Sequence, residues 1–205
     1  MANGYRPCVT PRRACFSKAS VKTRTLPRDM DVYVLTGQSN SLGTTDDPRH
    51  PGQEPPPDPA DSTMHFWWSN VEDAELCYGA GGIAALGVQQ GNTDNPNFWG
   101  PEFGFCRRLR QHTPHQPILF VKASRGGGGN GNWLKEGGHM YGHVVKQVRA
   151  ALAALPPGQG YRLRALLYIQ GESDSPAEAA ASGERLEALI RNLRTPTRLR
   201  TCFTV

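Results

Sequence analysis

Three stretches of the chain are continuously apolar, and each is followed at once by glycine or polar residues. These runs cover residues 32–35, 118–121 and 165–169. Short apolar runs bounded in this way are typical of strands that a parallel sheet buries on both faces. Met64–Trp68, which is shorter and rich in aromatic residues, predicts a further strand.

Between and after these strands, the spacing of apolar residues predicts three amphipathic helices. The first begins at Pro101, because proline fits the first helical position and the next residue, Glu102, favours the positive end of a helix. The second covers Met140–Leu155. The third follows a capping box formed by Ser175 and Glu178 and continues to about Leu193. Residues 41–61 and 77–99 lack periodicity and are predicted to be loops.

Strands therefore alternate with helices along the chain. This order predicts the α/β class, as a three-layer αβα fold built on a doubly wound parallel sheet of the flavodoxin-like kind. Ligands bind such sheets beyond the carboxyl ends of the strands, where the connecting loops meet. We therefore expect the functional residues in the loops that follow the apolar runs.

The charge of the chain is concentrated near its beginning. The net charge is +5, but residues 1–30 hold seven Lys and Arg against one acid, so the remaining residues are close to neutral. This balance argues against a nucleic-acid-binding face. We expect residues 1–30 to be a disordered basic leader, although the segment weakly resembles a transit peptide and Met30 could be the true start.

Two further classes of site are disfavoured by composition. No apolar run approaches the roughly 20 residues that a membrane span requires. The five cysteines show neither a CxxC pair nor a zinc-ligand spacing, so we expect free thiols and no metal site. The compartment is not indicated; cytoplasmic is the default, and export remains open if the true start differs.

Three loops follow the predicted strands and carry the candidate chemistry: Gly37–Asn40, Gly126–Asn132 and Gln170–Asp174. Ser39 lies directly after a strand and a glycine, where a nucleophile could emerge, although an ordinary turn serine also fits. The consecutive glycines of the second loop could direct several N–H groups at one anion. Phosphate or nucleotide binding is a weaker alternative, because neither a P-loop nor a complete dinucleotide fingerprint occurs.

Together these pieces resemble the SGNH hydrolases, and within them the sialate O-acetylesterase and acetylxylan esterase-like carbohydrate esterases. The matching motifs are Gly37-Gln38-Ser39-Asn40, Gly100-Pro101-Glu102, the glycine loop Lys122–Gly129 and Gln170-Gly171-Glu172-Ser173-Asp174. The resemblance covers residues 31–195 and implies an esterase domain that acts on an acetylated carbohydrate without a cofactor.

The resemblance also implies roles for individual residues. Ser39 corresponds to the serine that accepts the acyl group. The N–H groups of Ser39 and Gly127 and the side-chain amide of Gln170 correspond to the oxyanion hole, whose fixed donors stabilise a tetrahedral intermediate. The residues expected to support the substrate or the loops are Gln38, Asn40, Glu102, Glu172 and Asp174.

One motif of the resembled family, Asp-x-x-His, is expected to be absent. The resembled family activates its serine with a histidine from an Asp-x-x-His motif beyond the last strand, whereas here the last histidine is His143. We therefore expect an esterase domain that lacks its C-terminal elements, an irregular tail at residues 196–205, and impaired activity. His139 or His143 could replace the base, and a non-catalytic carbohydrate-binding pseudoenzyme is the alternative function.

Overall fold

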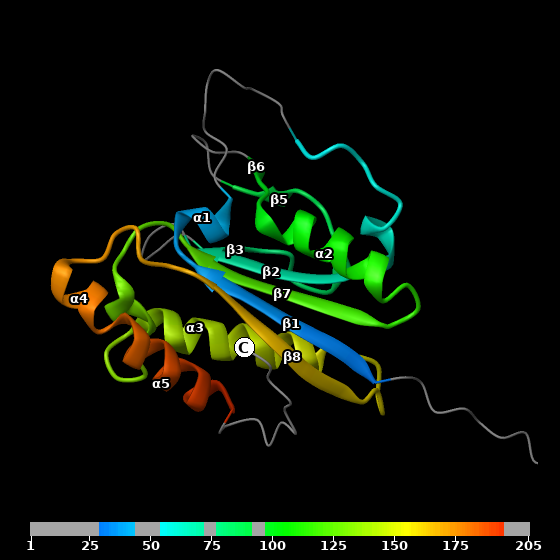
Figure 1. Ribbon diagram of the computed structural model, residues 1–205. Helices are drawn as coiled ribbons and strands as arrows, with labels where there is room; N and C mark the ends of the chain where they lie inside the picture. The colour runs from blue at the N-terminus through cyan, green and yellow to red at the C-terminus, as the bar shows by residue number, and fades with distance from the viewer. Residues whose placement is uncertain (1–28, 44–53, 72–76, 92–96, 195–205) are drawn as a thin grey trace, which may run out of the picture.

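The computed structural model describes residues 29–43, 54–71, 77–91 and 97–194 and places a mostly parallel sheet at the centre of the chain (Figure 1). The strand order is β3-β2-β7-β1-β8, and β4 pairs with the first two residues of β2, His65 and Phe66. The four long strands run parallel to one another, whereas β3 and β4 pair antiparallel with β2. The long strands are β1 (Met30–Gly37), β2 (His65–Val71), β7 (Ile118–Arg125) and β8 (Tyr161–Ile169).

Helices cover both faces of this sheet (Figure 1). On one face lies α2 (Pro101–His112), and on the other lie α3 (His139–Ala153), α4 (Pro176–Ala180) and α5 (Ser182–Arg194). The short helix α1 (Ser39–Leu42) lies at the carboxyl end of β1, and two 3-10 turns, η1 (Asp61–Thr63) and η2 (Asn130–Trp133), complete the set. The arrangement confirms the predicted three-layer α/β fold.

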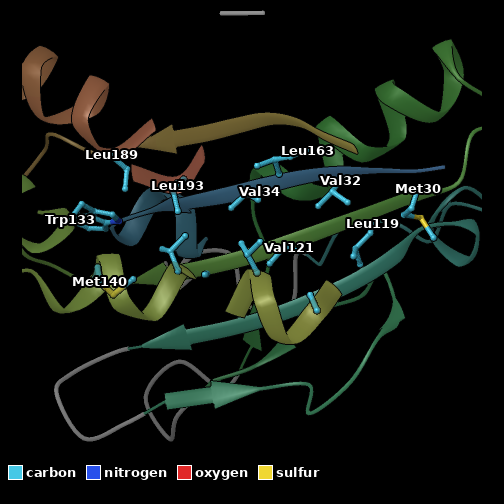
Figure 2. Packing of buried hydrophobic residues seen from close by; sticks show 14 residues of the cluster. Met30, Val32, Val34, Leu119, Val121, Trp133, Met140, Leu163, Leu189 and Leu193 are labelled. Atoms are coloured by element: carbon cyan, nitrogen blue, oxygen red, sulfur yellow. The ribbon is translucent and has the colours of Figure 1, made fainter. Parts of the chain in front are cut away.

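The two sides of β1 enter two separate hydrophobic clusters, because successive side chains of a strand point to opposite faces. Val32 and Val34 pack with residues of α3 and α5 (Figure 2). Tyr33 and Leu35 pack with residues of α2 on the opposite face. All eight residues of β1 are buried. The continuous apolar run in the sequence therefore reflects a strand that is covered on both sides.

Two predictions from the sequence need correction. Residues 77–99, predicted to be loop, contain four very short strands, β3 (Cys77–Gly79), β4 (Ala84–Ala85), β5 (Gln89–Gln90) and β6 (Asn97–Phe98). Strands of two or three residues are too short to produce a periodic pattern. The single helix predicted after Ser175 is divided at Ala181 into α4 and α5. Its start is correct, since Ser175 and Glu178 form the capping box.

The outer strand β8 is less covered than β1. Only Leu163 is buried among its nine residues, and Ala165–Ile169 are partly exposed. Within the described residues, no strand pairs with the outer edge of β8.

The described helices include none that is long and apolar enough to cross a membrane. The basic leader, apart from Asp29 and Met30, and the tail at 196–205 lie outside the described residues.

Candidate functional site

The turn after β1 can be formed only by glycine. Gly37 has φ +144°, and a Cβ atom at this position would lie 1.8 Å from the carbonyl oxygen of Ile169. The same carbonyl accepts a hydrogen bond from the N–H of Gln38 at 3.0 Å. The end of β1 therefore lies directly against the end of β8, and the chain turns sharply into α1.

Ser39 is the first residue of α1 and is partly exposed. Its N–H has no acceptor within the helix, because the first four N–H groups of a helix lack an intrahelical partner. The preceding residue, Gln38, is almost fully buried, and its carbonyl accepts the hydroxyl of Ser41 at 2.7 Å. The N–H of Gly43 donates to the carbonyl of Ser39 at 2.8 Å. The fold thus presents an accessible serine on a turn whose other side is buried.

The glycine loop begins directly after β7. The N–H of Gly126 donates to the carbonyl of Val71, the last residue of β2, at 2.9 Å. Gly127 is exposed and has φ +61°, and Gly128 follows with φ +88°. Two successive left-handed residues turn the loop back toward η2, and they leave the backbone of Gly127 open to solvent.

The loop after β8 contacts both of the other loops. The side-chain amide of Gln170 donates to the carbonyl of Gly128 at 3.1 Å and to Oδ1 of Asp174 at 3.2 Å. The side-chain amide of Asn40 donates to the carboxylate of Glu172. The three loops named by sequence analysis therefore lie together at one edge of the sheet. The amide nitrogen of Gln170 is, however, already engaged by two protein acceptors.

A group of polar side chains, which we call the Asp174 network, fixes the glycine loop. It consists of Asp174, Asn130, Gln170 and Tyr168. The carboxylate of Asp174 accepts the backbone N–H of Asn130 at 2.7 Å and its side-chain amide at 2.9 Å. The hydroxyl of Tyr168 donates to Oδ1 of Asn130 at 2.8 Å. Asp174 thus holds the far end of the loop that contains Gly127.

Two groups in this network have shifted pKa values. Partial burial alone would raise the pKa of Asp174, but the hydrogen bonds from Asn130 and Gln170 and the charge of Arg185 outweigh it and lower that pKa. Burial, together with the negative charge of Asp174, raises the pKa of Tyr168. Asp174 is therefore ionised and Tyr168 is a neutral hydrogen-bond donor at neutral pH.

Beneath α1 lies a second polar group, which sequence analysis named only in part. Glu102, expected to support a substrate or a loop, is fully buried and forms an ion pair with Lys122 at 3.0 Å. Sequence analysis names Lys122 only as the first residue of the glycine loop. Its signal in the sequence is a cation that interrupts a buried apolar run, between Val121 and Ala123.

The two candidate histidines lie on the α3 side of the sheet. His139 contacts the guanidinium of Arg125, and Nε2 of His143 lies 3.4 Å from the carbonyl of Ser69. Burial lowers the pKa of both imidazoles, and the charge of Arg125 lowers that of His139 further. Both residues, with Val71, Cys77 and Met140, line a hollow of about 350 Å³. Their described contacts are thus with β2 and β7, not with α1.

The expectation that the chain lacks an Asp-x-x-His is wrong, because Asp47 and His50 have this spacing. Asp47 and His50 are separated by two residues and follow closely after the serine turn in the sequence. They lie in segment 44–53, outside the described residues. Sequence analysis missed this pair, although its spacing can be read directly from residues 47–50.

Among the described residues, no group of three or more His, Cys, Asp or Glu side chains is arranged to hold a metal ion.

The loops at the carboxyl edge combine a serine, backbone N–H groups and side-chain amides. These groups suit nucleophilic attack and stabilisation of a developing oxyanion, which are the requirements of acyl transfer.

Comparisons with known proteins give the family and support the fold. A family model described as carbohydrate esterase, sialic acid-specific acetylesterase, matches residues 29–203. A solved structure of an Arabidopsis thaliana protein is 22% identical to this chain and superposes with a TM-score of 0.56. The matched region covers 86% of this chain and 74% of the Arabidopsis chain. A carbohydrate acetylesterase from Xanthomonas citri is 16% identical, with a TM-score of 0.51.

The second comparison covers 84% of this chain but only 41% of the Xanthomonas protein. At these identities the two structures support the fold alone. No curated protein matches the chain.

Proposed function

Because the chain belongs to the sialic acid-specific acetylesterase family of carbohydrate esterases, we propose that it removes acetyl groups from a glycan or from sialic acid, with Ser39 as the nucleophile. The observation that carries this proposal is the meeting of three loops at the carboxyl edge of the sheet. Asn40 contacts Glu172, and Gln170 contacts Gly128, so the serine turn, the glycine loop and the last loop form one site.

In the proposed reaction, Oγ of Ser39 attacks the carbonyl carbon of the acetyl ester and its proton passes to a base. The tetrahedral intermediate then collapses, and the sugar oxygen leaves with a proton as an alcohol. Water next attacks the acetyl-serine, releases acetate and restores the hydroxyl of Ser39. The reaction requires no cofactor.

The negative charge that develops on the carbonyl oxygen needs fixed donors. We assign this role first to the backbone N–H groups of Ser39 and Gly127, since each lies on an accessible turn. Gln170 is the third candidate. Because its amide nitrogen already donates to Gly128 and Asp174, it would have to exchange one of these bonds to reach a substrate. The removal of one such donor typically slows acyl transfer about 100- to 1,000-fold.

The remaining residues of the prediction support the site. Gln38 and Glu102 are buried beneath α1, so we assign them to the positioning of the turn rather than to contact with the sugar. Asp174 holds the glycine loop. Asn40 and Glu172 are exposed and are the better candidates for contact with an acetylated carbohydrate.

We expect this chain to hydrolyse acetyl esters at a low rate. A serine hydroxyl without a base is a weak nucleophile at neutral pH. Of the candidate bases among the described residues, His139 contacts Arg125 and His143 contacts Ser69, and neither contacts Ser39. These contacts also favour the alternative function, a pseudoenzyme that binds a carbohydrate in the same site without turnover.

Hydrolysis of 4-nitrophenyl acetate and of O-acetylated sialic acid by the purified 205-residue chain tests both functions. We expect weak turnover that is lost in Ser39→Ala and retained in Ser62→Ala, a control because Ser62 is an exposed serine of η1. Binding of the acetylated sugar without turnover would favour the pseudoenzyme.

Two other results would change the assignment. Equal activity of Ser39→Ala and the unchanged chain would rule out Ser39 as the nucleophile. Rapid turnover that depends on Ser39 would show that a base is present, and His50→Ala, His139→Ala and His143→Ala would then identify it.

A further inference from the structure

Lys122 is a charged residue in the interior of the sheet. It lies in β7 between Val121 and Ala123, and its side chain has no exposed surface. Burial of an ammonium group is costly unless the group is paired and all of its donors are used. A cation at this position therefore requires a specific set of acceptors.

All three donors of Lys122 have an acceptor. The ammonium nitrogen lies 2.7 Å from the carbonyl oxygen of Leu42, 2.6 Å from Oε1 of Gln89 and 3.0 Å from Oε1 of Glu102. We call these four residues the Lys122 cluster. Burial lowers the pKa of Lys122, and the charge of Glu102 opposes that shift. The cluster is the point at which β7, α1, β5 and α2 meet.

Glu102 connects the cluster to the start of α2. Its Oε1 accepts the N–H of Gly100 at 2.9 Å and the side-chain amide of Gln89 at 3.1 Å. The neighbouring residue, Trp99, donates its N–H to the carbonyl of Gly43 at 3.2 Å. Gly43 has φ +76°, and a Cβ atom there would lie 2.1 Å from the carbonyl oxygen of Trp99. The chain leaving α1 is thus held against the chain entering α2.

The bond to Leu42 connects this cluster to the nucleophile. Leu42 is the last residue of α1, and Ser39 is the first. A helix of a single turn does not persist without tertiary contacts, because nucleation of a helix is unfavourable. The carbonyls at its end also need donors from outside the helix. Lys122 supplies such a donor at the end of the turn.

We propose that Lys122 and Glu102 are positioning residues for Ser39: the buried ion pair holds the carbonyl of Leu42 and thereby sets the place of the serine hydroxyl and N–H. Neither side chain can touch a substrate, since both are fully buried. The proposal rests on the proposed function. A displacement of about 1 Å at a reacting group can slow a reaction about 100-fold, so the effect is measurable.

The decisive variant is the pair Lys122→Met with Glu102→Gln. Methionine retains much of the length of lysine, and glutamine retains an acceptor for Gly100 and Gln89. Besides the ion pair itself, the hydrogen bonds that are lost are those that Lys122 donates to the carbonyl of Leu42 and to Oε1 of Gln89. The matched control is Asp61→Asn with Arg107→Met. This second pair also joins α2 to a neighbouring element, at 2.7 Å, but it does not contact α1.

Amide hydrogen exchange measures the turn independently of activity. The N–H groups of Ser41, Leu42 and Gly43 all donate to carbonyls within the turn. In the Lys122/Glu102 variant we expect their exchange to accelerate at least about tenfold while the amides of β1 keep their protection, and the Asp61/Arg107 variant to leave all of them unchanged. Unchanged exchange at these three amides would overturn the proposal.

Reaction of Ser39 with a fluorophosphonate connects the turn to chemistry. We expect the second-order rate constant to fall at least about tenfold in the Lys122/Glu102 variant and to be unchanged in the control. Equal rates in the variant and the unchanged chain would overturn the positioning role. A failure of the unchanged chain to react at Ser39 would contradict the proposed function instead, and the exchange experiment would still decide whether the cluster holds the turn.

Discussion

The Lys122 cluster is closed to solvent, whereas the Asp174 network lies at the partly exposed edge of the same site. Both hold a loop that carries a proposed catalytic group: the cluster holds α1 through Leu42, and the network holds the glycine loop through Asn130. The first contains an ion pair in a medium of low dielectric, and the second contains one carboxylate surrounded by neutral donors. The same task is therefore performed in two environments.

This difference has a physical consequence. Removal of one partner from a buried ion pair leaves an uncompensated charge without water, which is strongly destabilising. A partly exposed carboxylate that loses a donor can be hydrated instead. We therefore expect the removal of one charge from the cluster to affect the whole fold, and changes in the network to affect mainly the loop.

The largest effect is expected for Lys122→Met alone. This change leaves the carboxylate of Glu102 buried without its cation, and we expect the free energy of unfolding to fall by about 3–5 kcal/mol. Urea denaturation followed by circular dichroism measures this loss. Arg107→Met breaks a bidentate ion pair between α2 and η1 that is partly exposed, so water can reach the remaining carboxylate and the loss should be smaller, about 1–2 kcal/mol. Equal losses in the two variants would contradict the comparison.

A smaller effect is expected for Asp174→Asn. The new NH₂ group at position 174 would face the side-chain NH₂ group of Asn130. Two hydrogen-bond donors would then face each other where Asn130 now donates to a carboxylate oxygen. We expect a loss of about 1–2 kcal/mol in the free energy of unfolding. We also expect faster exchange of the N–H of Asn130. The control is Asp58→Asn, since Asp58 lies on an exposed turn. If the N–H of Asn130 exchanges equally slowly in Asp174→Asn and in this control, the network does not hold the glycine loop.

The smallest effect concerns pH. The pKa of Asp174 is lower in the folded chain than its ordinary value of 3.8, so its contribution to stability is complete above that value. The contribution is lost as the pH falls through the folded pKa. The difference in unfolding free energy between the unchanged chain and Asp174→Asn should therefore be constant near pH 7 and shrink below about pH 4. A difference that persists undiminished at low pH would contradict this assignment.

The sequence predicted the long elements well because their patterns have direct physical causes. Strands β1 and β7 are covered on both faces, so their apolar runs are continuous. The start of α2 at Pro101 and the capping box of α4 follow from local chemistry that needs no tertiary information. The three functional loops were found for the same reason, since each directly follows a recognisable strand.

The remaining features depend on partners that are distant in the sequence. The strand β5 pairs with β6 through two residues on each side, and so short a ladder leaves no periodic pattern. Lys122 acquires its role from Leu42, Gln89 and Glu102, none of which is near it in the chain. The roles of Ser39, Gly127 and Gln170 in catalysis remain predictions.

The position of β1 between β7 and β8 also has a consequence for synthesis of the chain. Asp31 pairs with Ile118, and Gly37 pairs with Ile169, so both partners are translated long after β1. Because the chain is synthesised at about 5–20 residues per second, on the order of ten seconds pass between the synthesis of β1 and that of its last partner. For most of that interval, a strand whose residues are all buried in the folded chain has no neighbour on the nascent chain. The strand that delivers the serine is thus the segment at which we expect chaperones at the ribosome to bind first.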